Sequence, residues 1–147
     1  MSTAVKTPPQ ASDCHNRALR HASRRLSQVY DDFMAPTGLR STQFSLLSRL
    51  HKLGPVSINA LAAEMDLDRT TLGRNVLPLQ RDGLIAIEAD EADKRSKQVR
   101  LTALGAERLA QARGPWAKAQ AAFERQFGKE RAAMLRELLR EVAELTI

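Results

Sequence analysis

Cysteine and aromatic residues are scarce in this sequence, and their scarcity excludes several classes of protein. The 147 residues include one cysteine, Cys14, so the chain has no internal disulfide framework and fits a reducing compartment. Aromatic residues make up 4% of the chain, which leaves few platforms on which the bases of a single-stranded nucleic acid could stack. We therefore expect neither a disulfide-stabilised secreted domain nor a protein specialised for single strands.

Long apolar runs and metal-ligand spacings are missing as well. No segment approaches the roughly 20 apolar residues of a transmembrane helix, and the first ten residues lack the apolar core of a signal peptide. We therefore expect a cytoplasmic protein without a membrane partner. The histidines are scattered, no phosphate-binding glycine loop occurs, and no ligand residues repeat at metal spacing, so we expect no metal, no cofactor and no enzymatic activity.

Basic residues outnumber acidic residues. The 23 lysines and arginines against 17 aspartates and glutamates give a net charge of +6 and a pI near 10.1. This excess favours a polyanionic partner, but charge alone does not separate DNA from RNA or from an acidic membrane. The length is that of one typical domain.

An amphipathic helix is predicted to begin after Asp68 and to end at Gly83. Asp68 can accept the unpaired N–H groups at a helix start, and a glycine supplies the left-handed residue that often ends a helix. At 100° per residue, one side of this helix is apolar, which we expect to be core: Leu72, Val76 and Leu79. The opposite side centres on Thr70, Arg74 and Arg81, which can hydrogen-bond base edges and phosphates. This face suits the major groove of DNA; a merely solvated basic face is the alternative.

A β-hairpin is predicted directly after this helix. Ile85 and Ile87 alternate with smaller or polar residues, and a charged turn over 90–96 leads to a second strand over 98–101. A helix followed by a hairpin is the order of elements in a winged helix.

Three helices are predicted before this segment. The first spans about 12–34, and Ser41 can cap a second over 42–53, whose apolar side comprises Phe44, Leu47, Leu50 and Leu53. Ser57 can cap a third, short helix that ends a few residues before Asp68. This short helix and the one after Asp68 would form a helix-turn-helix.

Two more helices are predicted after the hairpin. Thr102 can cap a long helix, bent at Gly114–Pro115, and a final helix follows Gly128. The apolar stripes of the first helix and these last two exceed what a small winged helix can cover, so we expect them to bury one another across a two-fold axis. Trp116 is expected in the core or the dimer interface rather than against a cofactor. The predicted fold class is mainly α with a small β-hairpin wing.

Over roughly residues 12–145, the chain resembles the MarR family of bacterial transcriptional regulators. Three segments carry the resemblance: Gln43–Leu50 (QFSLLSRL), Leu67–Val76 (LDRTTLGRNV) and Asp93–Gly105 (DKRSKQVRLTALG). The last matches the family's Asp-x-Arg wing signature, followed by a Leu-Thr that opens the next helix. Pro78 departs from the commoner family pattern, and because it removes one backbone hydrogen bond we expect it to kink the last helical turn without ending the helix.

The resemblance implies a homodimeric repressor that binds a palindromic operator in double-stranded DNA and is released by a small molecule or by oxidation. It implies a flexible arm over 1–11 and one domain over 12–147, with the winged helix at about 37–101 and dimerisation helices at about 12–35 and 102–147. Ligand pockets in the family lie between the dimerisation helices and the winged helix.

The predicted wing tip carries Arg95, and a narrow minor groove attracts guanidinium groups of this kind. Asp93, two residues earlier, could hold Arg95 in place, and in the family the matching Asp and Arg play these roles. A solvated charged turn is the alternative. The complete set of candidate DNA contacts is Arg69, Thr70, Thr71, Arg74, Arg81, Asp93, Lys94, Arg95 and Lys97.

Cys14 is a candidate redox sensor. It is predicted in the first turn of the first helix, where the helix dipole favours the thiolate, and its position resembles that of the sensing cysteine in the OhrR branch of the family. That branch surrounds its cysteine with tyrosines, whereas the only tyrosine here is Tyr30, four turns onward. An ordinary semi-buried cysteine is the favoured interpretation.

Another class of function stays open, a winged-helix module that binds protein or RNA. Binding to duplex DNA that ignores sequence and vanishes at moderate salt would favour this alternative.

Overall fold

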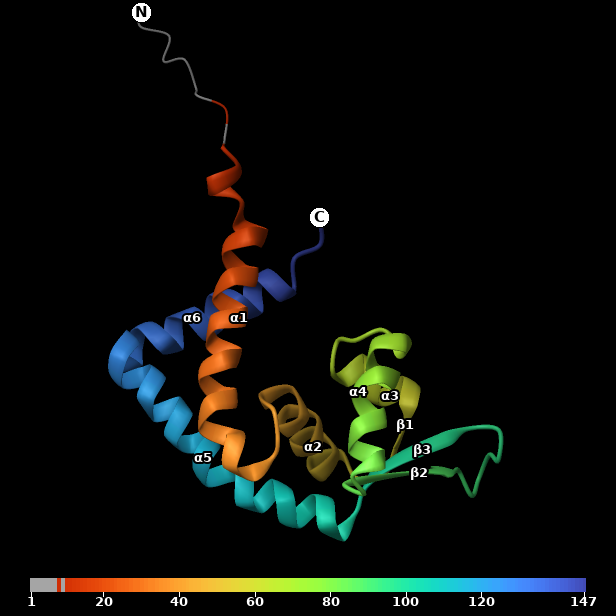
Figure 1. Cartoon of the computed structure of the whole chain (residues 1–147). Coiled ribbons are helices and arrows are strands. Elements are labelled where there is room, and N and C mark those ends of the chain that lie inside the picture. Colours follow the sequence, from red (N-terminus) through yellow and green to blue (C-terminus); the bar gives the residue numbers. More distant parts are fainter. Residues whose placement is uncertain (1–7, 9) are drawn as a thin grey trace, which may run out of the picture.

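A computed structural model describes residue 8 and residues 10–147 (Figure 1). Its elements are α1 (His15–Met34), α2 (Ser41–Leu53), β1 (Val56–Ser57), α3 (Ile58–Glu64), α4 (Arg69–Arg81), β2 (Ile85–Ala89), β3 (Lys97–Leu101), α5 (Ala103–Phe127) and α6 (Lys129–Ala143). The fold is mainly helical with a small antiparallel sheet, as predicted. The predicted arm over 1–11 falls largely outside the described residues. Among the helices described, none combines the length and apolarity needed to cross a membrane, and the cytoplasmic location stays a prediction.

The winged helix has one apolar core, to which α2, α3, α4 and the sheet all contribute. The predicted core side of α4 is confirmed, since these side chains are at most 2% exposed: Leu72, Val76 and Leu79. One predicted core position in α2 is wrong, because Leu53 is 37% exposed and Leu46 is buried instead. α2 packs against both β3 and α5, so it buries a wider side than one stripe, and its last residue lies at the edge.

Three antiparallel strands form the sheet, in the order β1-β3-β2. The register pairs Ile85 with Leu101 and Ile87 with Val99, so the apolar side chains of the hairpin share one face over the core. The strand β1 pairs Val56 with Val99 and was not predicted. With two residues, it is too short to show the alternation from which strands are recognised.

A hydrogen-bonded junction joins the end of α4, the base of the wing and the start of α5. Gly83 has φ +74°, as predicted, and beyond it the N–H of Leu84 reaches the carbonyl of Leu79 at 2.9 Å. The Thr102 hydroxyl donates to the Gly83 carbonyl at 2.6 Å and accepts from the N–H of Gly105 at 3.0 Å. A Cβ on Gly105 would lie 2.0 Å from the carbonyl oxygen of Leu84, so only glycine fits there.

The predicted cap of α2 is wrong. Ser41 is the first residue of the helix, and the N-cap is Arg40, whose N–H donates to Oε1 of Gln43 at 2.9 Å. The N–H of Ser41 donates to Oδ1 of Asp31, near the end of α1, at 2.7 Å. A side chain from another helix therefore satisfies this helix start, which a local pattern does not reveal.

The helices α1, α5 and α6 form the part of the molecule away from the wing (Figure 1). α1 begins at His15, a few residues later than predicted, because Ala11–Asp13 forms a separate 3₁₀ turn. Pro115 lies inside α5 and does not end it. The Tyr30 hydroxyl of α1 donates to Oε1 of Gln120 in α5, which ties these two helices together.

The apolar stripes of α1 and α6 are not covered within the chain. Leu19 of α1 is 41% exposed, and the α6 side chains Met134, Leu138 and Val142 are between 51% and 63% exposed. Of the residues in α6, only Ala132 is buried. These helices therefore fold with much of their apolar surface facing outward.

Replacing Gly105 by alanine is expected to lower the free energy of unfolding by about 3 kcal/mol, because the new Cβ has no room beside the Leu84 carbonyl. Urea denaturation would measure the loss. Gly73→Ala is the matched control: a Cβ at Gly73 meets nothing within 4 Å, so the higher helix propensity of alanine should stabilise the protein by about 0.5–1 kcal/mol. Equal effects of the two substitutions would contradict the close approach at Gly105.

Candidate nucleic-acid interface

The start of α4 is held by the predicted cap, Asp68. Its Oδ1 accepts from the N–H of Thr71 at 2.8 Å, and its Oδ2 accepts from the Thr71 hydroxyl at 2.7 Å. The backbone bond, and then the hydroxyl bond, hold the pKa of the Asp68 carboxyl below its ordinary value. Thr71 is also a predicted DNA contact. Because its hydroxyl proton is donated to Asp68, the Thr71 hydroxyl can take part in a further hydrogen bond only as an acceptor.

The side of α4 that faces away from the core carries the predicted reading residues. Thr70, Arg74 and Arg81 are all exposed, opposite the buried leucines and valine. Pro78 lies inside the helix, which continues to Arg81, so the prediction of one helix is confirmed and its kink stays a prediction. α4 therefore presents a continuous outward face with two guanidinium groups.

A tight turn shapes the tip of the wing. The N–H of Asp90 donates to the carbonyl of Ser96 at 2.9 Å, and the N–H of Ser96 donates back to the carbonyl of Asp93 at 2.9 Å. Oδ1 of Asp93 accepts from the backbone N–H of Arg95 at 3.1 Å. Asp93 therefore holds the backbone of Arg95, and among the described residues no ion pair joins the two side chains; an orienting role of Asp93 at DNA stays a prediction.

A polar cleft of about 420 Å³ lies where the wing meets the starts of α3 and α4. It collects three cationic side chains predicted to contact DNA, namely Arg69, Arg95 and Lys97. Ser57, Asn59 and Ser96 complete its polar lining and were missed as site residues. Cations and hydroxyl or amide groups together are the usual partners of a phosphate, so this cleft can hold one.

A second polar cleft, of about 350 Å³, lies on the other flank of α4, against the start of α2. It brings Arg40 next to Arg74, with Gln43 and Asn75 between the two helices. Arg40 was missed as a site residue because it is near Arg74 only in the folded chain. The sequence offered one indication, a cationic residue at a helix start, where the unpaired N–H groups also attract anions. α4 thus stands between two clefts that each carry cationic groups.

Two of the predicted cationic DNA contacts, Arg81 and Lys94, line neither of these clefts. Both side chains are exposed, Arg81 in the last turn of α4 and Lys94 in the turn of the wing. Glu88 of β2 pairs with Arg100 of the neighbouring β3 at 2.8 Å. That hydrogen bond and the charge of the guanidinium lower the pKa of the Glu88 carboxyl, and the pair offsets an acidic charge on the wing.

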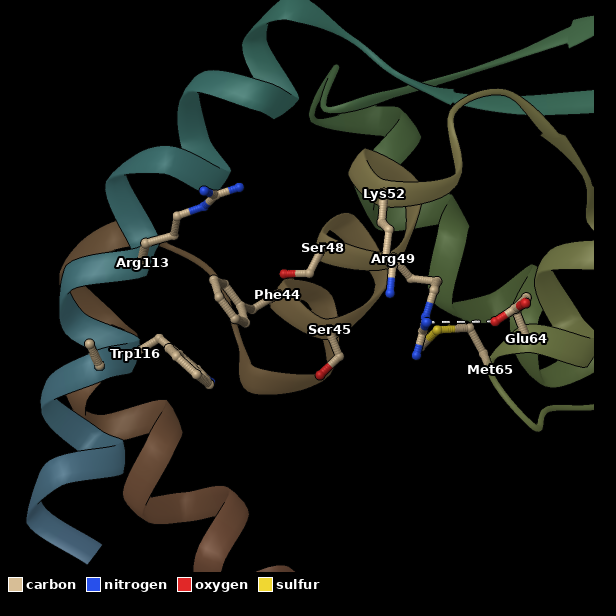
Figure 2. A pocket seen from close by; sticks show the side chains of 10 residues that line it. Phe44, Ser45, Ser48, Arg49, Lys52, Glu64, Met65, Arg113 and Trp116 are labelled. Atoms are coloured by element: carbon tan, nitrogen blue, oxygen red, sulfur yellow. Dashed lines mark ion pairs between the residues drawn. The ribbon is translucent and has the colours of Figure 1, made fainter. Parts of the chain in front are cut away.

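A larger cleft of about 890 Å³ lies between the winged helix and α5, and Figure 2 shows the side chains that line it. Phe44 of α2 stacks on Trp116 of α5, with ring centroids 5.6 Å apart and planes at 19°. Trp116 is 37% exposed, so it is not part of the core within this chain, and a place in a dimer interface stays a prediction. Lys52 and Arg113 add positive charge to the cleft, whereas Arg49 is paired with Glu64 at 3.7 Å.

Cys14 immediately precedes α1, as its N-cap, and its side chain is exposed. The favoured expectation of a semi-buried cysteine is therefore wrong within this chain, because the helix start projects beyond the elements that could cover it. Tyr30 lies far along α1 and bonds to Gln120, so it does not surround the thiol. The described residues include no group of three or more His, Cys, Asp or Glu side chains that could hold a metal.

Solved structures similar to this chain are regulators of transcription. The Mycobacterium tuberculosis transcriptional regulator MosR in complex with DNA is 34% identical, with a TM-score of 0.74 over 90% of this chain and 99% of that one. A probable transcriptional regulator from Pseudomonas aeruginosa is 26% identical, with a TM-score of 0.82 over 90% and 99%. Bordetella bronchiseptica BpsR, whose DNA binding is regulated by 6-hydroxynicotinic acid, is 24% identical, with a TM-score of 0.81 over 95% and 100%. No curated protein sequence matches the chain significantly.

A helix-turn-helix with a basic outward face and a wing defines a winged-helix, DNA-binding transcriptional regulator. The sequence model of the MarR family matches residues 39–97, which include the helix-turn-helix and most of the wing. This match, together with the 34% sequence identity to MosR over 90% of the chain, establishes that the chain belongs to the MarR family. The resemblance drawn from its motifs is confirmed.

Proposed function

We propose that the protein is a homodimeric repressor that binds a palindromic operator in double-stranded DNA and is released by a small-molecule effector. Each subunit places the Thr70 and Arg74 face of α4 in a major groove and Arg95 of the wing in the flanking minor groove. The observation that carries this proposal is the placement of α4 between two cationic clefts. Phosphates on either side of a groove would occupy the clefts while the outward face reads base edges.

The uncovered helices support the homodimer. Met134, Leu138 and Val142 leave an apolar stripe along α6, with Leu145 exposed just beyond its end, and monomeric proteins rarely expose large patches of this kind. A second copy of the chain is the partner that two-fold symmetry supplies. The symmetry then requires two half-sites with centres roughly 10 bp apart, so that both copies of α4 meet the same side of the duplex.

The cleft between α2 and α5 supports release by an effector. A volume of about 890 Å³ is in the range of small-molecule sites, and the lining combines two aromatic rings with cationic groups (Figure 2). Residues of α2, which belongs to the winged helix, line one side of the cleft, and residues of α5 line the other. A ligand that separated Phe44 from Trp116 would therefore change how the winged helix sits on the long helices, and hence the spacing of the two reading helices.

Arg74→Ala is expected to cost about 1–3 kcal/mol for each contacted base pair and to relax the preference at that position, because arginine is a bidentate reader of guanine. Selection from a random duplex library, followed by affinity measurements on the selected site, would measure both effects. Arg125→Ala, an exposed arginine at the end of α5, is the matched control and should leave the motif unchanged. If Arg74→Ala weakened all sequences equally and returned the wild-type motif, Arg74 would serve only as a charge. Binding by the wild-type protein that ignores sequence and vanishes at moderate salt would favour the protein or RNA module instead.

The homodimer is expected to persist at micromolar concentration in sedimentation experiments, and Leu138→Glu should dissociate or unfold it, because a charge would enter the buried stripe. Arg140→Glu is the control, since Arg140 lies on the opposite side of α6 on a helical wheel. A folded wild-type monomer at this concentration would contradict the proposed dimer.

Exposure of the thiol favours a second candidate function, a peroxide-sensing repressor of the same family. Cys14 is accessible at the start of α1, as a sensing thiol must be. Oxidation to a sulfenic acid would add a polar group at a dimerisation helix, and only a small thiol or the other subunit's copy of this cysteine could resolve it. Mild organic peroxide should then lower operator affinity for the wild type and not for Cys14→Ser. Unchanged binding by the wild type after peroxide would exclude the sensor.

A further inference from the structure

One side chain on the outward face of α4 has no role in the proposed contacts. Leu77 is 61% exposed, although every other leucine of α4 is buried. At 100° per residue it falls between Gly73 and Thr70, close to the direction of Arg81 and Arg74. Leu77 thus points with the reading residues and away from the core.

An exposed leucine is common on protein surfaces, so its exposure alone carries little information. The surroundings of Leu77 are what distinguish it. The cleft that contains Arg69 lies on one flank of α4, the cleft that contains Arg40 and Arg74 lies on the other, and Leu77 lines neither. Leu77 therefore stands on the ridge of α4 between two sites suited to phosphates, where a groove would present base edges.

The side chain of Leu77 also lies apart from the exposed apolar side of α6. Further exposed apolar residues lie on α6, which stands apart from α4 in Figure 1. A second subunit that covers α6 would thus leave Leu77 in place on the DNA side. The chemical group of a major groove that offers apolar contact is the C5-methyl of thymine.

We propose that Leu77 is a specificity-determining residue, which packs against the C5-methyl group of one thymine in each half-site. This inference rests on the proposed function, because it requires α4 to enter the major groove of a preferred sequence. It adds an apolar contact to the thymine of an A·T pair, which a hydrogen-bonding side chain of α4 cannot make in the same way. Cytosine at the same position offers no methyl group, and a guanine or adenine would place polar edges against the leucine.

The experiment replaces thymine by deoxyuridine, which removes the methyl group and leaves base pairing and every hydrogen-bonding group unchanged. The probe is the duplex selected by the full-length wild-type protein from the random library, with each thymine replaced in turn. For the wild type, one substitution in each half-site should weaken binding about fourfold, the value expected for one buried methyl group.

Leu77→Ala provides the second arm of the experiment. Alanine has the highest helix propensity, so α4 is expected to stay folded, and a thermal melt would verify this. The variant should bind the thymine duplex more weakly than the wild type and should not distinguish thymine from deoxyuridine at that position. Leu77→Met, which keeps an apolar side chain of similar volume, should retain the discrimination. Leu104→Ala, an exposed leucine at the start of α5, is the matched control and should behave as the wild type.

The outcomes separate the inference from the proposed function. If the selected motif is bound tightly but no deoxyuridine substitution weakens the wild type, or if Leu77→Ala keeps the same sensitivity, the role of Leu77 is overturned and the proposed function stands. If Leu77→Ala instead dissociates the dimer in sedimentation, the residue contacts another subunit and the inference is also overturned. If selection returns no motif, the sequence-specific function fails, and the inference fails with it.

Discussion

The hydrogen bonds of Thr102, together with the absence of a side chain at Gly105, determine how the two parts of this regulator are joined. The Thr102 hydroxyl binds the residue that ends α4 and caps the helix that begins α5, while its own N–H donates to Leu84 at the base of the wing. Because Gly105 lets the backbone of α5 approach the Leu84 carbonyl, the reading helix, the wing and the long helix meet within a few residues. These contacts constrain the direction of α4 relative to the start of α5.

Local patterns in the sequence predicted correctly the features that depend on residues close to one another along the chain. The cap at Asp68, the left-handed Gly83 and the buried side of α4 follow from chemistry within one or two helical turns. They were less reliable where the decisive partner comes from elsewhere. The start of α2 is satisfied by Asp31 of α1, and Leu46 is buried because α2 packs on two sides. Neither arrangement leaves a trace in the spacing of residues around α2.

The candidate interface shows the same division. The composition of the reading face could be predicted, since a helical wheel separates Arg74 from the leucines of the core. The grouping of Arg69, Arg95 and Lys97 around one cleft could not, because the wing and the start of α4 meet only after the hairpin has formed. Arg40 joined the interface for the same reason. The predicted link between Asp93 and Arg95 is made through the backbone, since an aspartate at a turn readily binds the N–H two residues on.

Trp116, which stacks on Phe44, gives the protein an intrinsic fluorescence probe. The chain contains a single tryptophan, and that tryptophan stands at the mouth of the cleft between α2 and α5, partly in water and partly against another ring (Figure 2). Its emission therefore comes from one known place, with no contribution from a second indole. A compound entering the cleft would change the hydration of this ring, and candidate effectors could be ranked by a fluorescence titration of the unlabelled protein, before any operator is known.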